Sequence, residues 1–317
     1  MLANFPNQLF SGILAPSMSS KPFSGIIGHE AAISCLGRML EDGTLAHAYL
    51  FVGQPRVGKR AVALALLNAL FSVPGHIGSH PDIVMIRRET DEKTGKEKTA
   101  VSVEQVRDAC ERLSMTSLSG GRKALFIEEA DRLNAAAGNA LLKTLEEPRG
   151  DAIIILRANS VDAVPATIAS RCQIVRFHPV PPATIAEAFV KRGVDREEAA
   201  SLAQASFGAP GAALSLLTDG EYRAQEETAA AAAAQLFSSP VARRLRAASD
   251  LLPKDEANKG AVALRTLETW ERILRERMLS SLSRKDARTL RRLRAARMAI
   301  LHNASPQLAI EHVLISV

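Results

Sequence analysis

The chain has 317 residues, which is enough for two or three compact units, each with its own core. Apolar residues make up 47% of it and aromatic residues only 4%, so burial relies on Ala, Leu, Ile and Val and favours helices over a β-sandwich. The formal net charge of +6 favours an anionic partner without identifying one. No apolar run is long enough to cross a bilayer, and the first twenty residues lack the basic start of a secretory signal. We therefore expect a cytoplasmic protein with a loosely ordered leader over residues 1–22.

The cysteines and histidines do not predict a metal site. Cys35, Cys110 and Cys172 lie far apart in the sequence and form no C-x-x-C pair, so we expect small buried hydrophobic residues in a reducing compartment. His76 and His80 are four residues apart but have no Cys or third ligand nearby. We expect no zinc.

The first half of the chain alternates between apolar runs and helix-forming segments. A strand predicted over Tyr49–Val52 enters the segment GQPRVGKR, residues 53–60, and a helix-forming segment follows. After a hydrophilic loop at 90–99, residues 103–113 place apolar side chains on one helix face. A second strand is predicted in KALFIEEAD, then a helix with Asn134 as N-cap and Pro148 as stop, then a third strand over Ala152–Leu156.

Strands that alternate with helices predict a parallel sheet covered on both faces, with the loop after the first strand at the carboxyl edge, where such sheets bind ligands. We therefore expect an α/β nucleotide-binding domain over residues 23–179. A Pro-rich hinge then starts a small helical domain at 180–219, and the Ala- and Arg-rich remainder, 220–317, predicts a separate all-α bundle.

The segment 53–60 has the spacing of a phosphate-binding loop. Gly53 and Gly58 allow the backbone to point amide groups at a phosphate, and Lys59 would add a positive charge there. A P-loop continues with Ser or Thr, whose hydroxyl holds the magnesium ion, but here the residue is Arg60. A guanidinium cannot ligate a cation, and the bulky Arg56 crowds the loop further.

The second predicted strand ends in Glu128 and Glu129, where a P-loop protein that hydrolyses nucleotide usually has a metal-supporting Asp followed by a catalytic Glu. A glutamate can hold magnesium through water, so this change is less damaging than Arg60. Together the two motifs argue against ATP turnover. Two alternatives remain: a site that binds no nucleotide, and a site that binds ATP without hydrolysing it. No cofactor is required.

Three segments carry a resemblance to a known family: AHAYLFVGQPRVGKR, FIEEADRLNAAAGNALLKTLEEP and PATIASRCQIVRF. Together they resemble the clamp-loader branch of the AAA+ family, in order from about residue 28 to residue 179 and more weakly to the end. Within that branch, EEADRLN resembles the stationary subunit more than the D-E-x-H form of the motors. The resemblance implies an AAA+ domain, a small helical lid and a helical collar, belonging to the machine that opens the sliding clamp and places it on primed DNA.

The resemblance also implies roles for single residues. The Arg of S-R-C, here Arg171, would be an arginine finger offered in trans to a neighbouring ATPase, and Asn159 stands at the position of a polar nucleotide sensor. Taken alone, Arg171 is an ordinary surface arginine and Asn159 a turn cap. Ala212 replaces a lid arginine that senses the γ-phosphate in many relatives, and the four cysteines of the family's zinc module are missing.

The implied partners are the tau/gamma ATPase subunits and the delta subunit of a bacterial DNA polymerase III clamp loader, a heteropentamer, and through them the clamp and primed DNA. The chain would then have no catalysis of its own but would belong to a DNA-directed DNA polymerase holoenzyme, a nucleotidyltransferase. Two other functions are weighed: an ATP-hydrolysing tau/gamma-like motor of the same loader, and a stand-alone DNA-binding AAA+ protein.

The densest charge lies between Arg284 and Arg297, with seven Lys or Arg and one Asp. It could contact DNA phosphates or an acidic partner. Leu290, Leu293, Ala296 and Ile300 recur on one side, and no aromatic residue is available to stack on bases, so we predict a packing helix with a basic outer face.

Overall fold

The computed structural model describes residues 22–73, 77–90, 97–98, 100–148, 150–253, 256–281, 284–301 and 304–317. The chain divides into two compact units between Leu214 and Ser215. The predicted leader, apart from residue 22, and most of the loop at 90–99 lie outside the described residues. The boundary predicted between an α/β domain and a helical lid at 179/180 stays a prediction.

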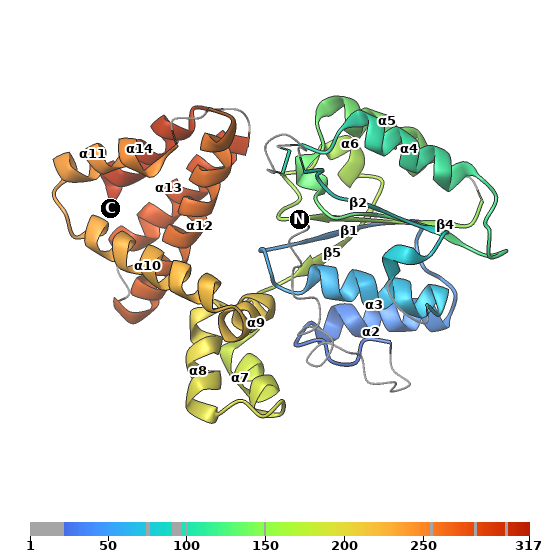
Figure 1. Cartoon of the computed structure of the whole chain (residues 1–317), viewed down its shortest axis with the longest axis horizontal. Coiled ribbons are helices and arrows are strands. Elements are labelled where there is room, and N and C mark those ends of the chain that lie inside the picture. Colours follow the sequence, from blue (N-terminus) through green and yellow to red (C-terminus); the bar gives the residue numbers. More distant parts are fainter. Residues whose placement is uncertain are drawn as a thin grey trace, which may run out of the picture. The chain divides into compact units, whose positions relative to one another are not determined.

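The first unit is built on a five-stranded parallel sheet (Figure 1). The strands follow the order β2-β3-β4-β1-β5, which places β1 between two neighbours. Their bounds are β1 Ala48–Gly53, β2 Ile83–Ile86, β3 Lys123–Ile127, β4 Ala152–Ala158 and β5 Gln173–Phe177.

The parallel sheet and its three predicted strands are confirmed, while β2 and β5 were not predicted. Both are edge strands of the sheet. β2 is an apolar run of only four residues, too short to indicate a strand by itself, and β5 buries only its last residue, Phe177.

Helices cover both faces of the sheet, α4, α5 and α6 on one side and α2 and α3 on the other (Figure 1). The helices and 3-10 turns of this part are α2 Glu30–Glu41, α3 Lys59–Phe71, η1 Ile77–Ser79, α4 Val103–Ser114, η2 Ala130–Arg132, α5 Ala135–Glu146 and α6 Ala166–Ala169. They are followed by α7 Pro182–Val190, α8 Arg196–Ala205 and α9 Pro210–Thr218.

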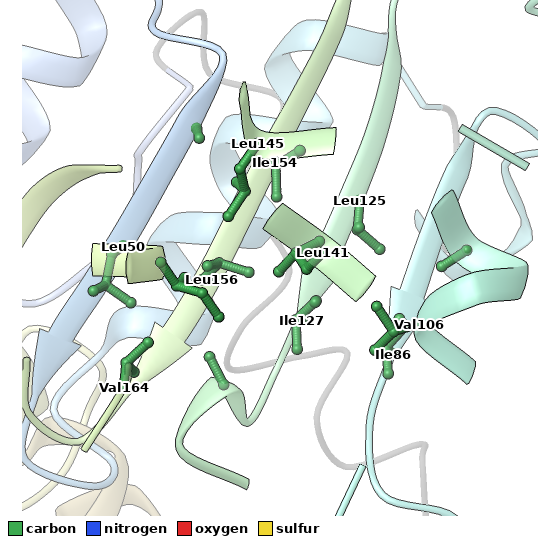
Figure 2. Close-up of a cluster of buried hydrophobic side chains, with 14 of the residues drawn as sticks. Leu50, Ile86, Val106, Leu125, Ile127, Leu141, Leu145, Ile154, Leu156 and Val164 are labelled. Atoms are coloured by element: carbon green, nitrogen blue, oxygen red, sulfur yellow. The ribbon is translucent and has the colours of Figure 1, made fainter. Parts of the chain in front are cut away.

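Alternate strand residues enter two separate cores. Leu50, Leu125 and Ile154 face α4 and α5 in the core drawn in Figure 2, whereas their neighbours Tyr49 and Phe126 face α2 and α3. Successive side chains of a strand point to opposite faces, so the apolar runs are long because both faces are buried.

The helix boundaries follow local capping chemistry. Asn134 caps α5 as predicted, since its side chain accepts a hydrogen bond from the Ala137 amide at 2.8 Å. Ser102 and Gln105 form a reciprocal capping box at the start of α4. The predicted apolar face of α4 is confirmed, because Val106 and Leu113 are buried in the core.

The second unit consists of helices with a core of their own. They are α10 Gly220–Phe237, α11 Val241–Leu251, α12 Glu256–Ser281, α13 Arg284–Leu301 and α14 Pro306–Ser316. Phe237 and Trp270 meet edge to face at 5.6 Å in this core. No helix among the described residues is both long and apolar enough to span a membrane.

Candidate functional site

The candidate site begins where β1 ends, at the carboxyl edge of the sheet. The loop from Gly53 leads directly into α3, which starts at Lys59, so the predicted order of strand, loop and helix is present. Gly53 is needed for packing, because a Cβ there would overlap the carbonyl oxygen of Phe177 on β5. Gly58 adopts a φ of 124°, which favours glycine.

The loop's own carbonyl groups hold Lys59. Its side chain is 3% exposed, and its ammonium donates hydrogen bonds to the Gly53 carbonyl and, at 2.8 Å, to the Gln54 carbonyl. A phosphate that used this charge would have to compete with both carbonyl groups. Lys59 is thus enclosed by the loop, as in a P-loop, but its ammonium already donates to two backbone carbonyl groups.

The turn after α8 and the start of α9 form hydrogen bonds with the same loop. The Gln54 side-chain amide donates to the Phe207 carbonyl at 3.0 Å, and the Gly211 amide donates to the Arg56 carbonyl at 2.9 Å. A Cβ on Gly211 would lie 2.8 Å from that carbonyl, so the contact depends on glycine. The next residue, Ala212, is buried, and its methyl group has no polar atom to offer a phosphate.

Arg60 forms an ion pair with Glu128, which follows β3. The Arg60 Nε lies 2.8 Å from Glu128 Oε2, and its Nη2 lies 3.4 Å from Oε1, so both carboxylate oxygens are engaged. The Glu128 side chain is only 11% exposed. Glu128, the predicted support for a magnesium ion, is therefore already paired with a cation. That cation is the guanidinium of Arg60, the residue that stands in place of the P-loop hydroxyl.

Arg157 on β4 is a second cation at Glu128, and the sequence analysis did not identify it. Its Nε donates to the Glu128 backbone carbonyl at 2.6 Å, and its Nη2 lies 3.7 Å from the carboxylate. Burial lowers the pKa of Arg157, while Glu128 and Glu129 act in the opposite direction. The available signal was a charged residue within the apolar strand sequence AIIILRA.

Glu129 is held by Arg88, another residue that the sequence analysis did not identify. Two hydrogen bonds of 2.7 and 2.9 Å join the guanidinium to the carboxylate. Burial would raise the pKa of Glu129, but the bonds and charge of Arg88 outweigh it and leave that pKa below its usual value. Both predicted acidic residues therefore lie in structural ion pairs with this chain's own arginines.

Asn159 follows the end of β4, and its side-chain amide donates to Asp131 in η2 at 2.9 Å. It links two loops at the carboxyl edge of the sheet, a contact that differs from the turn cap considered from sequence.

Arg171 lies at the amino ends of the strands, whereas the loop lies at their carboxyl ends. It precedes β5, whose first residue, Gln173, pairs with Tyr49, whereas Gly53 pairs with Phe177 at the other end. Its guanidinium contacts Glu146 at 2.5 Å and donates to the Thr167 carbonyl at 2.8 Å. The side chain is 36% exposed. These are the contacts of a surface arginine, at a place that cannot serve the chain's own loop.

The described residues hold no group of three or more His, Cys, Asp or Glu arranged to bind a metal. His76 lies outside them, and His80 accepts a hydrogen bond from the Asp82 amide at 3.2 Å and packs against Phe71. Of the cysteines, Cys35 is exposed, so its predicted burial is wrong, while Cys110 and Cys172 are partly buried. Burial raises the pKa of Cys172 to about 11.

A parallel sheet with a glycine-containing loop between its first strand, β1, and the following helix, and with acidic residues after β3, defines a P-loop-type α/β protein. Residues 28–181 match the model of the family described as "DNA polymerase III, delta subunit". The resemblance of this part of the chain to delta-prime subunits is confirmed by the family match and by the curated relatives.

The curated relatives agree with this placement. The DNA polymerase III delta-prime subunit of Pseudomonas aeruginosa is 34% identical over 172 residues, or 50% of each chain. That of Escherichia coli K12 is 33% identical over 197 residues, or 57% of each chain. The tau subunit of Salmonella typhimurium is 30% identical over 172 residues, which cover 26% of its length. The chain spans about half the length of the delta-prime relatives it matches.

Two solved structures from Thermotoga maritima are similar at lower identity. The RuvB Holliday junction branch migration motor is 18% identical, with a TM-score of 0.46 over 62% of each chain. A DNA polymerase III gamma subunit-related protein is 17% identical, with a TM-score of 0.46 over 88% of this chain and 97% of that chain. The fold assignment rests on the sheet itself.

Proposed function

We propose that this chain is the delta-prime subunit of a bacterial DNA polymerase III clamp loader and that it works as the rigid member of that assembly in the cytoplasm. It does not hydrolyse ATP, and it supplies Arg171 to the nucleotide site of a neighbouring tau/gamma subunit. The delta subunit completes the assembly, which acts on the sliding clamp and primed DNA. The family match of residues 28–181 supports membership, the geometry of the loop supports the absence of hydrolysis, and the position of Arg171 supports its action in trans.

The contact between Arg60 and Glu128 carries the proposal. Magnesium demands oxygen ligands in near-octahedral geometry at about 2.0–2.1 Å, and a P-loop supplies one from its Ser or Thr hydroxyl. Here that residue supplies a guanidinium, which is itself bonded to the acidic residue that would support the metal. The positive charge of Arg60 therefore replaces the ion and provides no ligand for one. ATP bound without hydrolysis is compatible with this arrangement, and no cofactor is required.

The hydrogen bonds that join the loop to the turn after α8 and to the start of α9 support a rigid role. Motor subunits couple nucleotide exchange to motion between the sheet and the helices behind it. In this chain direct hydrogen bonds join Gln54 to Phe207 and Arg56 to Gly211. These bonds tie the loop to the helices that follow the sheet and so favour a fixed arrangement of the two.

The position of Arg171 supports action in trans. The five residues of β5 separate it from the carboxyl edge, and at about 3.3 Å per residue this is more than 13 Å. At the amino ends of the strands its side chain pairs with Glu146 and is partly exposed. Arginine fingers accelerate phosphoryl transfer by about 10³–10⁵ because they stabilise the charge of the transition state.

The test is a loader reconstituted with Arg171→Ala, assayed for DNA-dependent ATPase activity and clamp loading. We expect the neighbouring site to lose about 10³-fold or more of its rate and loading to fail. Arg176→Ala is the matched control, since Arg176 is an exposed arginine on β5, and it should behave as the parent does. Normal loading by the Arg171→Ala assembly would remove the role in trans.

The isolated chain separates the proposal from a motor function. A tau/gamma-like motor hydrolyses ATP by itself in a saturable, magnesium-dependent reaction. We expect no hydrolysis above background from this chain, with an active motor subunit as positive control. Turnover by the purified chain that Lys59→Ala abolishes would contradict the proposed function.

A further inference from the structure

The geometry points to a second contact surface, on α13 of the C-terminal unit: we propose that its exposed basic stripe binds the phosphate backbone of double-stranded nucleic acid independently of sequence. The stripe consists of Arg284, Lys285, Arg288, Arg291 and Arg292, all of which are exposed. This surface is separate from the loop and from Arg171, so it does not depend on the function proposed for them.

The helix divides into an apolar side and a basic side. Leu290, Leu293, Ala296 and Ile300 are buried in the core of this unit, which confirms the predicted packing face. At 3.6 residues per turn the five basic residues occupy an arc of about 120° on the opposite side. The basic side chains are therefore held in one row by a helix whose rotation is set by its core.

The positive charge of the stripe is not neutralised by the surrounding described residues. Asp286 is the one acidic residue of the helix, and it is 3% exposed and pairs with Arg277 on α12. The acids of α12 that reach α13, Glu268 and Glu271, pair with Arg294 and Arg297 outside the stripe. No ion pair among the described residues involves the five side chains of the stripe itself.

The chemistry of the stripe favours nucleic acid over an acidic protein. Protein interfaces depend on buried apolar or aromatic anchors, whereas the exposed side of α13 carries only basic residues and Ala295. Four of the five are arginines, whose planar donors suit phosphate oxygens. The helix has no aromatic residue to stack on unpaired bases, so backbone contacts to a duplex fit better than single-strand binding.

The dimensions agree with this partner. Residues 284–292 span about 12 Å along the helix. Duplex DNA carries one phosphate per ~1.7 Å of its axis when both strands are counted, so about seven phosphates lie within that length, enough for the five side chains. Contacts of this kind give non-specific affinities of about 10⁻⁴–10⁻⁶ M at physiological salt. They are too weak for a stand-alone DNA-binding protein but useful within an assembly that already holds DNA.

The experiment measures binding of the full chain to a fluorescent DNA duplex by anisotropy, from 50 to 300 mM salt. Five contacts predict a slope of log K against log salt of about −4 to −5, and Arg288→Gln, Arg291→Gln and Arg292→Gln together should reduce it to about −2. At 150 mM salt that is a loss of about a hundredfold. The control combines three changes of equal charge at scattered exposed arginines: Arg107→Gln, Arg196→Gln and Arg243→Gln.

Ala295 provides a test that does not depend on removing side chains, because it lies within the arc of the stripe and is exposed. Ala295→Lys should tighten binding and steepen the slope by about one, and Ala295→Glu should weaken binding. Equal losses in the stripe and control triple variants would overturn the proposal, as would absence of duplex binding at 50 mM salt. Stripe-dependent binding of polyglutamate in preference to DNA would assign the surface to an acidic protein instead.

Discussion

Asp82 holds an exposed loop in place, and its replacement gives a sharp stability prediction. The residue is fully buried just before β2, and its carboxylate accepts four hydrogen bonds from the loop that follows α4. Oδ1 accepts the Leu118 amide at 2.9 Å. Oδ2 accepts the Ser117 hydroxyl and the Ser119 amide, both at 2.9 Å, and the Ser119 hydroxyl.

Asp82→Asn keeps the shape and one acceptor oxygen but places an NH₂ group among the three donors at Oδ2. The two serine hydroxyls can turn and accept from it, whereas the Ser119 amide cannot. An unsatisfied buried donor costs about 1–3 kcal/mol, and charge-assisted bonds contribute more than neutral ones. We therefore expect a loss of about 2–4 kcal/mol in the free energy of unfolding of the first unit.

Urea unfolding followed by far-UV circular dichroism measures this loss. With a urea dependence of about 1–3 kcal/mol per molar, the midpoint of the first unit should fall by about 1–2 M. Trp270, the sole tryptophan, reports the second unit by fluorescence in the same samples. Asp108→Asn, the same change at an exposed position on α4, should shift the midpoint little. A midpoint for Asp82→Asn equal to that control would refute the reasoning.

The same carboxylate gives a pH dependence. Burial alone would raise the pKa of Asp82, but the hydrogen bonds from Ser119, Leu118 and Ser117 hold it well below its usual value. A depressed pKa contributes stability that is present above the unfolded value of about 3.9 and is lost as the pH falls below it. The parent should therefore lose more stability between pH 5 and pH 3 than Asp82→Asn does, and equal losses would contradict this assignment.

Three further outcomes are expected. Cys172, whose pKa burial raises to about 11, should react with iodoacetamide at pH 8 far more slowly than the exposed Cys35, as mass spectrometry of the folded protein can show. Gly53→Ala should cost more than about 2 kcal/mol because the new methyl group meets the β5 backbone, whereas Gly121→Ala, which faces open space, should be nearly neutral in the same urea assay. Arg60→Ala should change stability by no more than about 1 kcal/mol, because the arginine is half exposed, and a larger loss would mean that the pair with Glu128 contributes more than a half-exposed ion pair should.

Much of the architecture could be predicted from local patterns. The apolar runs of β1, β3 and β4 and the helix N-cap at Asn134 are properties of neighbouring residues, so they can be read along the chain. The buried side of α13 follows from helical periodicity in the same way. The edge strands β2 and β5 were not predicted. The apolar run of β2 is only four residues long, and most of β5 is exposed.

By itself, the sequence determined that a loop with phosphate-binding spacing follows a buried strand, that Arg60 stands in place of the metal-binding hydroxyl, and that S-R-C resembles a family motif. Only the tertiary structure decided that Arg60 reaches Glu128, that Lys59 is held by its own loop, and that Arg171 lies at the opposite edge of the sheet. The physical reason is that spacing along the chain predicts local conformation, whereas a charged side chain's partner depends on which distant segments the strand order brings together. Arg60 and Glu128 meet because the start of α3 and the end of β3 both lie at the carboxyl ends of the parallel strands.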